Sequence, residues 1–234
     1  MAFTKPKKII SPVAVAAPWP KITVADEYQG VRAFKAGLIL DPNDSGVQDY
    51  LDVIAEQAQI SFVAAIAEID EALESATGKK LATLKERKEN MKKHVPVSDE
   101  YAEDGTITGR VIVKYKRNES GTYRSGKNAG QDWTATVPCF DASKKPLSES
   151  DGIIYGGSTL RIQAEVVPFS MAATSTAGVS LRMVAVQVIE LVTGGDDTSG
   201  FDVEEGGYQA SEVQRVVSKT EGIPFETADD SGDF

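Results

Sequence analysis

Residues 114–133 combine positively charged and aromatic side chains in one short, glycine-containing segment. The segment reads KYKRNESGTYRSGKNAGQDW, and its cations and rings are Lys114, Lys116, Arg117, Arg124, Lys127, Tyr115, Tyr123 and Trp133. Such a mixture is typical of proteins that bind single-stranded nucleic acid, because cations follow the phosphates and flat rings stack on the bases. Each stacked base contributes about 1–3 kcal/mol, so a few exposed rings would suffice. The alternative is an ordinary solvated hairpin without a ligand, and the segment alone leaves both interpretations open.

Other kinds of site lack the residues that they would need. The single cysteine, Cys139, cannot form an internal disulfide, and the single histidine, His94, excludes a histidine-dependent triad and a Cys/His zinc site. The glycine pair at 156–157 is not followed by Gly-Lys-Ser/Thr, so it predicts a turn and not a phosphate loop. The paired acids at 196–197 and 204–205 lie in polar sequence that would not hold catalytic geometry. We therefore expect no enzymatic activity, no metal and no cofactor.

The negative charge of the chain is concentrated near its C-terminus. The net charge is −10, and residues 194–234 contribute −9 of it, from eleven acidic and two basic side chains. Residues 110–145 carry eight basic and three acidic side chains. The acidic average therefore describes a tail and does not argue against nucleic-acid binding by the rest of the chain. The last residues add a terminal ring to the acids, which suits a basic pocket on a partner, and the candidate partner-binding residues are Asp229, Asp230, Asp233 and Phe234.

Alternating and apolar runs predict five strands, at residues 31–40, 107–116, 133–140, 158–167 and 179–192. Between the first two strands, residues 45–94 form a helical insert, with an amphipathic helix that ends at Gly78 and a charge-rich helix over 79–93. Five strands with one helical insertion favour a mainly β protein built on a five-stranded antiparallel barrel of the OB-fold type. We expect an OB-fold DNA-binding domain at 1–193 and an acidic tail at 194–234 that is disordered when unbound.

Strand parity divides residues 110–116 into a polar and an apolar face. Because side chains alternate with a period of two, one face holds Arg110, Ile112, Lys114 and Lys116, and the other holds Val111, Val113 and Tyr115. The first face suits a groove and the second suits a core. By the same rule Arg32 shares a side with Phe34, and Arg161 shares a side with Phe169 if their strand extends that far. A core position is the alternative for each of these two phenylalanines.

The N-terminal segment imitates a secretion signal without matching one. Lysines at positions 5, 7 and 8 precede an apolar stretch at 9–17, but this stretch is short and contains Pro12. We interpret it as a basic arm leading into a first strand, in a cytoplasmic protein. The longest unbroken apolar run, residues 62–67, is far shorter than the roughly 20 residues of a membrane-spanning helix, so we expect no membrane association.

Two segments near the end of the body resemble one protein family. Residues 155–169, YGGSTLRIQAEVVPF, and 177–191, AGVSLRMVAVQVIEL, are similar to the last two strands of the phage replication single-stranded DNA-binding proteins, and the acidic ending Gly-Asp-Phe matches that family too. Weaker similarity covers 34–43 and 104–116. The resemblance implies an OB-fold protein that coats single-stranded DNA at a phage replication fork. It also implies homodimers formed partly by tail exchange, and contacts of the tail with the replicative DNA polymerase and the helicase/primase.

The resemblance further implies positions for the groove residues. The groove aromatic of the family falls on Phe169, and its basic residues fall near Arg32, Lys35, Lys114 and Lys116. This chain departs from the family at 170–171, where Ser-Met replaces a basic residue and a large aromatic one, so this end of the groove would bind more weakly or use Arg182 or Trp133. The candidate DNA-binding residues are Arg32, Phe34, Lys35, Arg110, Lys114, Tyr115, Lys116, Tyr123, Arg124, Lys127, Trp133, Arg161 and Phe169.

The charge distribution predicts a competition between the tail and DNA. A tethered anionic segment has a high effective concentration at a basic groove, so its acids would occupy the groove until DNA displaces them and frees Phe234 for a partner. Two other functions stay open. One is a scaffolding protein that assembles through the helical insert at 45–94, and the other is an RNA-binding chaperone, which would differ at contacts to the 2′-hydroxyl.

Overall fold

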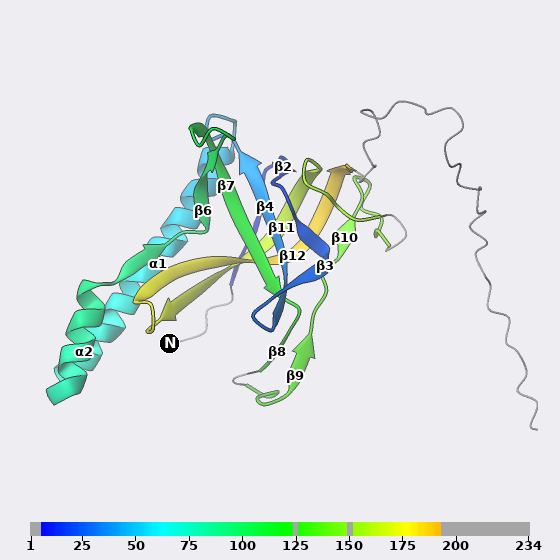
Figure 1. Ribbon diagram of the computed structural model, residues 1–234. Coiled ribbons are helices and arrows are strands. Elements are labelled where there is room, and N and C mark those ends of the chain that lie inside the picture. Colours follow the sequence, from blue (N-terminus) through cyan, green and yellow to red (C-terminus); the bar gives the residue numbers. More distant parts are fainter. Residues whose placement is uncertain (1–5, 124–125, 149–151, 193–234) are drawn as a thin grey trace, which may run out of the picture. The chain divides into compact units, whose positions relative to one another are not determined.

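The computed structural model describes residues 6–123, 126–148 and 152–192, and this part of the chain is mainly β, with two helices (Figure 1). The elements are β1 (Lys7–Ile10), β2 (Ala14–Ala16), β3 (Lys21–Tyr28), β4 (Val31–Leu40), α1 (Val47–Glu74), α2 (Gly78–Glu89), β5 (Lys92–His94), β6 (Val97–Tyr101), β7 (Ile107–Asn118), β8 (Ser120–Thr122), β9 (Asp132–Thr134), β10 (Cys139–Phe140), β11 (Thr159–Met171) and β12 (Thr176–Glu190). The predicted tail, with Asp229, Asp230, Asp233 and Phe234, lies outside the described residues, as does Arg124.

Five strands pair along a path that returns to its starting point. The order is β11, β2, β4, β7, β12 and again β11. These pairings are antiparallel except that of β7 with β12, which is parallel. Further strands are added at the sides of this path: β1 pairs with β11, β3 with β4, and β6 with β7. Strands β8 and β9 form a separate hairpin, which projects below the long strands in Figure 1.

The inward faces of the long strands form the hydrophobic core. Buried residues alternate with more exposed ones along much of β4, β11 and β12 and at Val113 and Tyr115 of β7, as the period of a strand requires. The fully enclosed side chains include Leu38, Val113, Ile162, Leu181 and Met183. Burial of each such side chain stabilises the fold by roughly 1.5–3 kcal/mol. The alternate residues of the same strands are left at the outer surface.

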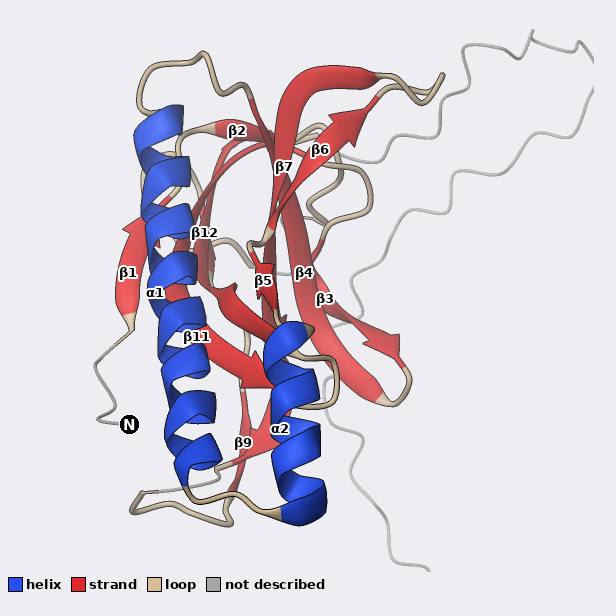
Figure 2. Cartoon of the chain, turned by 90° about the vertical axis from the view of Figure 1, so that its left-hand side faces the viewer, coloured by secondary structure: helices blue, strands red, loops and turns tan. Residues whose placement is uncertain are grey.

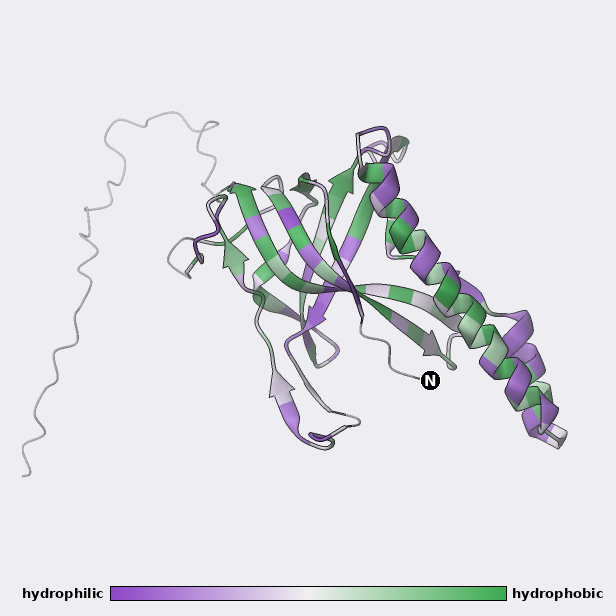
Figure 3. Cartoon of the chain, turned by 180° about the vertical axis from the view of Figure 1, so that it is seen from behind, coloured by the Kyte–Doolittle hydropathy of each residue, from purple (hydrophilic) through white to green (hydrophobic). Residues whose placement is uncertain are grey.

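Helix α1 covers the core with one narrow face. Its buried residues recur every three or four positions, which places them on a single stripe, and they are Val47, Tyr50, Ile54, Ala58, Ser61, Ala65 and Ile69. The helix packs on β11 and β12, where the Ser61 hydroxyl donates a hydrogen bond of 2.7 Å to the carbonyl of Gly178. Figure 2 shows α1 running beside the strands, and Figure 3 shows hydrophobic and hydrophilic residues alternating along it.

Helix α2 lies against α1 and has no buried residue. The Lys88 ammonium forms an ion pair with Asp70 of α1. The two helices of the predicted insert are present, but the first ends at Glu74 and not at Gly78, which begins α2. The second helix is shorter than predicted, because the chain turns after Glu89 and residues 92–94 pair with β12 as β5. No helix in the described ranges is long and apolar enough to cross a membrane.

The predicted strands are present, but the count of five is wrong. Strand β4 has the predicted bounds, and β7, β11 and β12 cover the predicted ranges with ends that differ by a few residues. The range 133–140 is split into β9 and β10, because residues 135–138 leave the ladder and Pro138 has no N–H to donate. The sequence pattern does not predict β1, β2, β3, β5, β6 and β8, most of which are too short to display an alternation.

Candidate nucleic-acid interface

A row of charged residues crosses six neighbouring strands on their outer face. The strand register pairs Lys21 with Lys35, Lys35 with Lys116, Lys116 with Arg182, Arg182 with Glu165, and Glu165 with Lys8. Directly paired residues point to the same face of a sheet, and residues adjacent to them in sequence, including Ile9, Ile22, Ala36, Tyr115, Leu181 and Ala164, are buried on the other face. We call the five bases, Lys8, Lys21, Lys35, Lys116 and Arg182, the cationic row. Neighbouring strands lie about 4.8 Å apart, so the row is about 24 Å long.

Two members of the cationic row have acidic partners. The Lys35 Nζ lies 2.8 Å from Asp26 Oδ2, and the Arg182 guanidinium donates two hydrogen bonds, of 2.6 and 3.0 Å, to Glu165 Oε2. The hydrogen bond and the charge of Lys35 hold the pKa of Asp26 below its ordinary value. Exposed ion pairs contribute about 0–1 kcal/mol. A phosphate can therefore replace either carboxylate at little cost.

The other three members of the cationic row form no ion pair with the part of the chain that the structure describes. These are Lys8, Lys21 and Lys116. Lys116 is placed between Lys35 and Arg182 in the register, and like charges directly opposite one another destabilise a sheet. An anion that binds along the row removes this repulsion.

The cationic row leads into a groove beside the β8–β9 hairpin. The groove has a volume of about 650 Å³ and is bounded by the end of β7, by the hairpin, and by the outer faces of β11 and β12. We call it the hairpin groove. Its cations are Lys116, Arg117 and Arg182, and its rings are Tyr123 and Trp133. Cations, the exposed ring of Tyr123 and the partly buried ring of Trp133 are therefore combined within one depression, and this combination suits single-stranded nucleic acid.

The backbone of the hairpin fixes the two rings. Trp133 is the register partner of Gly121, and a Cβ at Gly121 would lie only 2.7 Å from the indole ring, so the ring rests against bare backbone. The Tyr123 N–H donates a hydrogen bond of 2.9 Å to the carbonyl of Gln131, which extends the ladder by one pair. The Thr122 hydroxyl donates to Asp132 Oδ1 at 2.7 Å. Both rings are thus carried by an ordered hairpin.

Two arginines, Arg117 in the lining of the hairpin groove and Arg32 outside that lining, each have a partner in the fold. Arg117 lies on the inward face of β7, but it is near the end of the strand, and its Nη1 donates a hydrogen bond of 3.1 Å to the carbonyl of Met183. Arg32 lies one residue before Ala33, which pairs with the groove residue Asn118. The Arg32 Nε lies 2.7 Å from Glu119 Oε2, so its charge is partly neutralised.

The remaining predicted cations lie on the surface outside the groove lining. Lys114 is exposed two residues before Lys116 on the same face of β7, and Lys127 is exposed in the connection between β8 and β9. Arg161 is exposed on the outer face of β11, which also carries Glu165. The predicted residues Lys35, Lys116, Tyr123 and Trp133 are those that the structure brings together in the cationic row or the hairpin groove.

Phe169 lies on the outer face of β11, two residues beyond the groove residue Val167. It is half-buried, and its ring centre lies 5.4 Å from that of His94. At the following position the Arg87 guanidinium of α2 donates a hydrogen bond of 3.0 Å to the Ser170 hydroxyl. A cation from the helical insert thus reaches this end of the strand. The sequence had suggested Arg182 or Trp133 for this role and had not suggested Arg87.

Two predicted DNA contacts are corrected by the structure, because their rings lie in the core. Phe34 is 3% exposed and Tyr115 is 2% exposed. Both lie on the inward face of their strands, and the Tyr115 hydroxyl is 2.6 Å from the hydroxyl of Tyr50 on α1. Burial raises the pKa of Tyr50 to about 12 and raises that of Tyr115. Neither Phe34 nor Tyr115 can stack on a base in this structure.

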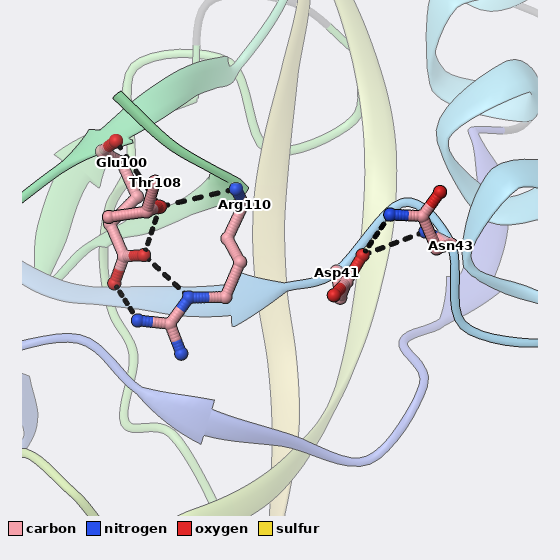
Figure 4. A network of polar contacts seen from close by, with 5 residues as sticks. All are labelled: Asp41, Asn43, Glu100, Thr108 and Arg110. Carbon is pink, nitrogen blue, oxygen red and sulfur yellow. Dashed lines mark hydrogen bonds and ion pairs between the residues drawn. The ribbon is translucent and has the colours of Figure 1, made fainter. Parts of the chain in front are cut away.

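Arg110 is the third predicted residue that the structure separates from the groove. It lies on the outer face of β7, but six residues from Lys116, which is about 20 Å along a strand. Its Nε and Nη2 donate hydrogen bonds of 2.6 and 3.0 Å to the two oxygens of Glu100, which also accepts from the Thr108 hydroxyl at 2.6 Å (Figure 4). The pKa of Glu100 is lowered mainly by the hydrogen bond from Thr108, and also by the hydrogen bond and the charge of Arg110.

The sequence pattern did not indicate Lys8 and Lys21 as DNA-binding residues. It suggested Arg182 only as a possible replacement for the family's residues at 170–171. The available signal was parity, since Lys8 precedes the buried Ile9 and Lys21 precedes the buried Ile22. Parity assigns each lysine to an outer face, but it does not say which strand lies alongside. In the described part of the chain, no group of three or more His, Cys, Asp or Glu side chains could hold a metal ion.

A β body with an exposed cationic row and a ring-lined groove defines a candidate binder of a flexible polyanion. A family model described as "Single-stranded DNA-binding protein, Bacteriophage T7" matches residues 13–191, and the chain belongs to this family. The resemblance found in the sequence is thereby confirmed.

Two curated relatives are similar over their whole length. The "Single-stranded DNA-binding protein" of Enterobacteria phage T3 is 29% identical over 248 residues, covering 100% of both chains. That of Escherichia phage T7 is 29% identical over 245 residues, covering 97% of this chain and 99% of the relative. The crystal structure of gp2.5, a single-stranded DNA binding protein encoded by bacteriophage T7, matches with a TM-score of 0.61 at 24% identity, over 88% of this chain and 100% of that one, and therefore shares its fold.

Proposed function

We propose that the protein binds single-stranded DNA along the cationic row and in the hairpin groove, without sequence preference and without catalysis. The observation that carries the proposal is the register that aligns five bases on one outer face and leads them to Trp133 and Tyr123. The names of the T3 and T7 relatives support the same ligand. Phosphates take the place of Asp26 and Glu165 beside Lys35 and Arg182, and the aromatic rings stack on whichever nucleobase arrives. The sequence of the DNA is therefore not read.

A titration of oligo-dT against salt tests this function. Each phosphate neutralised on a single strand contributes about −0.7 to the slope of log K against log salt concentration, so full use of the five bases predicts a slope of about −3.5. Tryptophan fluorescence is the readout, with a duplex of the same sequence as the control. A flat fluorescence signal, together with no retardation of oligo-dT in a gel at low salt, would exclude the function.

We also propose that the closed path of five strands is an OB-fold barrel. The support is the cycle of pairings through β2, β4, β7, β12 and β11, with the nucleic-acid face on its outside. The shortest pairings in the path are those of β2 with β4 and β11 and that of β7 with β12, which contain two residue pairs each. An experimental structure in which β2 failed to pair with both β4 and β11 would contradict the barrel.

For the acidic tail we propose two roles, competition with DNA and recruitment of replication proteins. Residues 194–234 carry a net charge of −9 and end in Phe234, so they are opposite in charge to the cationic row and supply an apolar anchor. Deletion of residues 222–234 should strengthen binding of oligo-dT at low salt and abolish binding to the phage DNA polymerase and helicase/primase. Equal affinity of the intact and shortened chains at low salt would rule out the competition.

We further propose that the protein is a homodimer that protects single-stranded DNA at a replication fork in the bacterial cytoplasm. The support is membership of a phage family and the length of the cationic row, which covers several nucleotides at once. Sedimentation of the intact chain tests the dimer, and nuclease digestion of a coated strand tests protection. Oligo-rU in the same titration tests the alternative of an RNA chaperone, which predicts affinity for oligo-rU at least equal to that for oligo-dT.

A further inference from the structure

Trp19 is a large aromatic side chain that lies almost entirely in solvent. It is 87% exposed, and its backbone has a φ of +61°, which is uncommon for a bulky residue. Large rings are normally buried or face a ligand. In this protein a strained backbone holds the ring out of the core.

The backbone around Trp19 is held from both sides. The Ala17 N–H donates a hydrogen bond of 2.9 Å to the carbonyl of Gly37 in β4, and the Gly157 N–H donates one of 2.9 Å to the carbonyl of Ala16. A Cβ at Gly156 would lie 2.9 Å from the Cα of Pro18, so the two loops are in direct backbone contact. Strain of this kind persists where the surroundings over-determine it, and it gathers at functional sites.

Trp19 borders a second depression, of about 590 Å³, which we call the tryptophan pocket. The loop between β2 and β3, the start of β3, and residues 153–156 line it. Its exposed apolar side chains are Trp19, Val24, Ile153 and Tyr155. The one charged residue in its described lining is Lys21.

Lys21 connects this pocket to the cationic row. It lines the tryptophan pocket, and three register steps lead from it through Lys35 and Lys116 to Arg182, which lines the hairpin groove. Three strand spacings amount to about 14 Å. A depression lined by aromatic rings therefore lies at each end of this stretch of basic side chains. Lys21 lines one depression, and Lys116 and Arg182 line the other.

We propose that the tryptophan pocket is a second base-binding subsite for single-stranded DNA, in which Trp19 and Tyr155 receive one or two unstacked bases while Lys21 contacts the adjoining phosphate. The inference rests on the proposed function and extends it to a region outside the hairpin groove. The occupant is nucleic acid because the charge found among the described lining residues is positive and continues the cationic row. A flat, exposed ring on a backbone that neighbouring segments hold can serve as a stacking platform for any nucleobase.

The chain offers a direct test, because Trp19 and Trp133 are its only tryptophans. The variants Trp133→Phe and Trp19→Phe each keep a stacking ring and leave one fluorescent reporter. Trp133→Phe leaves Trp19 in the tryptophan pocket, and Trp19→Phe leaves Trp133 in the hairpin groove. Each is titrated with oligo-dT of about 4 and about 16 nucleotides, the range of site sizes for one OB fold. We expect the Trp133 signal to be quenched by both lengths and the Trp19 signal to be quenched by the longer one.

Affinity measurements complete the test. Trp19→Ala should weaken binding of the longer oligonucleotide about 5- to 100-fold and leave that of the shorter one within about twofold. Tyr155→Ala should act in the same direction. The matched control is Tyr28→Ala, which removes an exposed ring from the other end of β3, outside both depressions, and should leave both affinities unchanged.

The outcomes separate the subsite from the general function. If Trp133 is quenched but Trp19 is not, and Trp19→Ala binds the longer strand like the unmodified chain, the subsite is excluded and DNA binding stands. If no oligonucleotide binds the unmodified chain, the proposed function itself fails. If Trp19→Ala changes sedimentation but not DNA affinity, the tryptophan pocket is a contact between protein chains and the subsite is excluded.

Discussion

Strand β7 presents bases at both of its ends, and the two ends differ in what surrounds them. At one end Arg110 is held by both oxygens of Glu100, which also accepts the Thr108 hydroxyl. At the other end Lys116 has no ion pair among the described residues and is placed between Lys35 and Arg182. Both residues lie on the outer face of one strand. The comparison teaches that two basic side chains on one strand can differ in availability, because the fold gives Arg110 a carboxylate partner and gives Lys116 none among the described residues.

The largest effect should come from reversing charge in the unpaired part of the cationic row. We expect Lys21→Glu combined with Lys116→Glu to weaken oligo-dT binding about 100-fold or more at low salt and to reduce the salt slope by about 1.4, the contribution of two phosphates. Fluorescence titration at several salt concentrations measures both. The control is Lys79→Glu combined with Lys80→Glu on α2, which changes the net charge equally and far from the row in sequence. A similar loss in the control would reduce the comparison to an effect of net charge.

A second prediction concerns the rings of the two faces of the sheet. Trp133→Ala should weaken binding about 5- to 100-fold, because it removes a stacking surface from the hairpin groove. Tyr115→Phe should leave binding within about twofold and lower the free energy of unfolding by about 1 kcal/mol, because it breaks the hydrogen bond to Tyr50. Oligo-dT titration and urea denaturation of both variants check this pair. Weaker DNA binding by Tyr115→Phe at full stability would contradict the core assignment.

The paired end of β7 should respond in stability and not in DNA binding. Arg110→Gln should lower the free energy of unfolding at pH 7 by about 0.5–1 kcal/mol, because the Arg110 side chain is 49% exposed and solvent screens its pairing with Glu100, and it should leave oligo-dT affinity within about twofold. A loss of affinity comparable to that of the charge reversal at Lys116 would show that Arg110 contacts DNA after all.

The same pair predicts a pH dependence. Because the pKa of Glu100 is lowered in the folded chain, its ionised form stabilises the fold above the unfolded-state pKa of about 4.3, and this contribution is lost as the pH falls through the lower folded-state value. The difference in stability between the unmodified chain and Arg110→Gln should therefore be full at pH 7 and shrink toward pH 3. Urea denaturation across this range measures it, and a difference that stayed constant would exclude the linkage.

The smallest effect should come from freeing a paired base in the cationic row. Asp26→Asn removes the carboxylate that holds Lys35, so Lys35 becomes available to phosphate, and affinity for oligo-dT should rise about two- to fivefold at low salt. The increase should disappear at high salt, where exposed charges are screened. Unchanged or weaker binding would indicate that Asp26 positions Lys35 for DNA and does not compete with it.

Local patterns predicted the elements and faces, and they failed where strands from distant parts of the chain meet. The bounds of β4 and the outward position of Lys114 and Lys116 follow from an apolar alternation within a few residues. The inward position of Phe34 also follows from that alternation, but its choice as a DNA contact required knowing which face is the core. The pairing of Lys8 with Glu165 joins residues more than 150 positions apart, and nothing local encodes it.

Charge pairing was equally invisible in the sequence. Arg110 and Glu100 are ten residues apart, and they meet because the register that pairs Asp99 with Val111 brings the next residues, Glu100 and Arg110, side by side. The distinction between a neutralised and an available basic side chain therefore depends on strand register, which composition alone does not show.

The cationic row joins the first and the last strands of the described chain, and this has a consequence during synthesis of the protein. Arg182, which follows Lys116 in the cationic row, is carried by the last strand of the described chain, whereas Lys8 is carried by the first. A nascent chain emerging from the ribosome cannot assemble the row until about residue 190 has left the exit tunnel, and such distant contacts form slowly. We therefore expect the proposed affinity for DNA to appear only when synthesis of the chain is nearly complete.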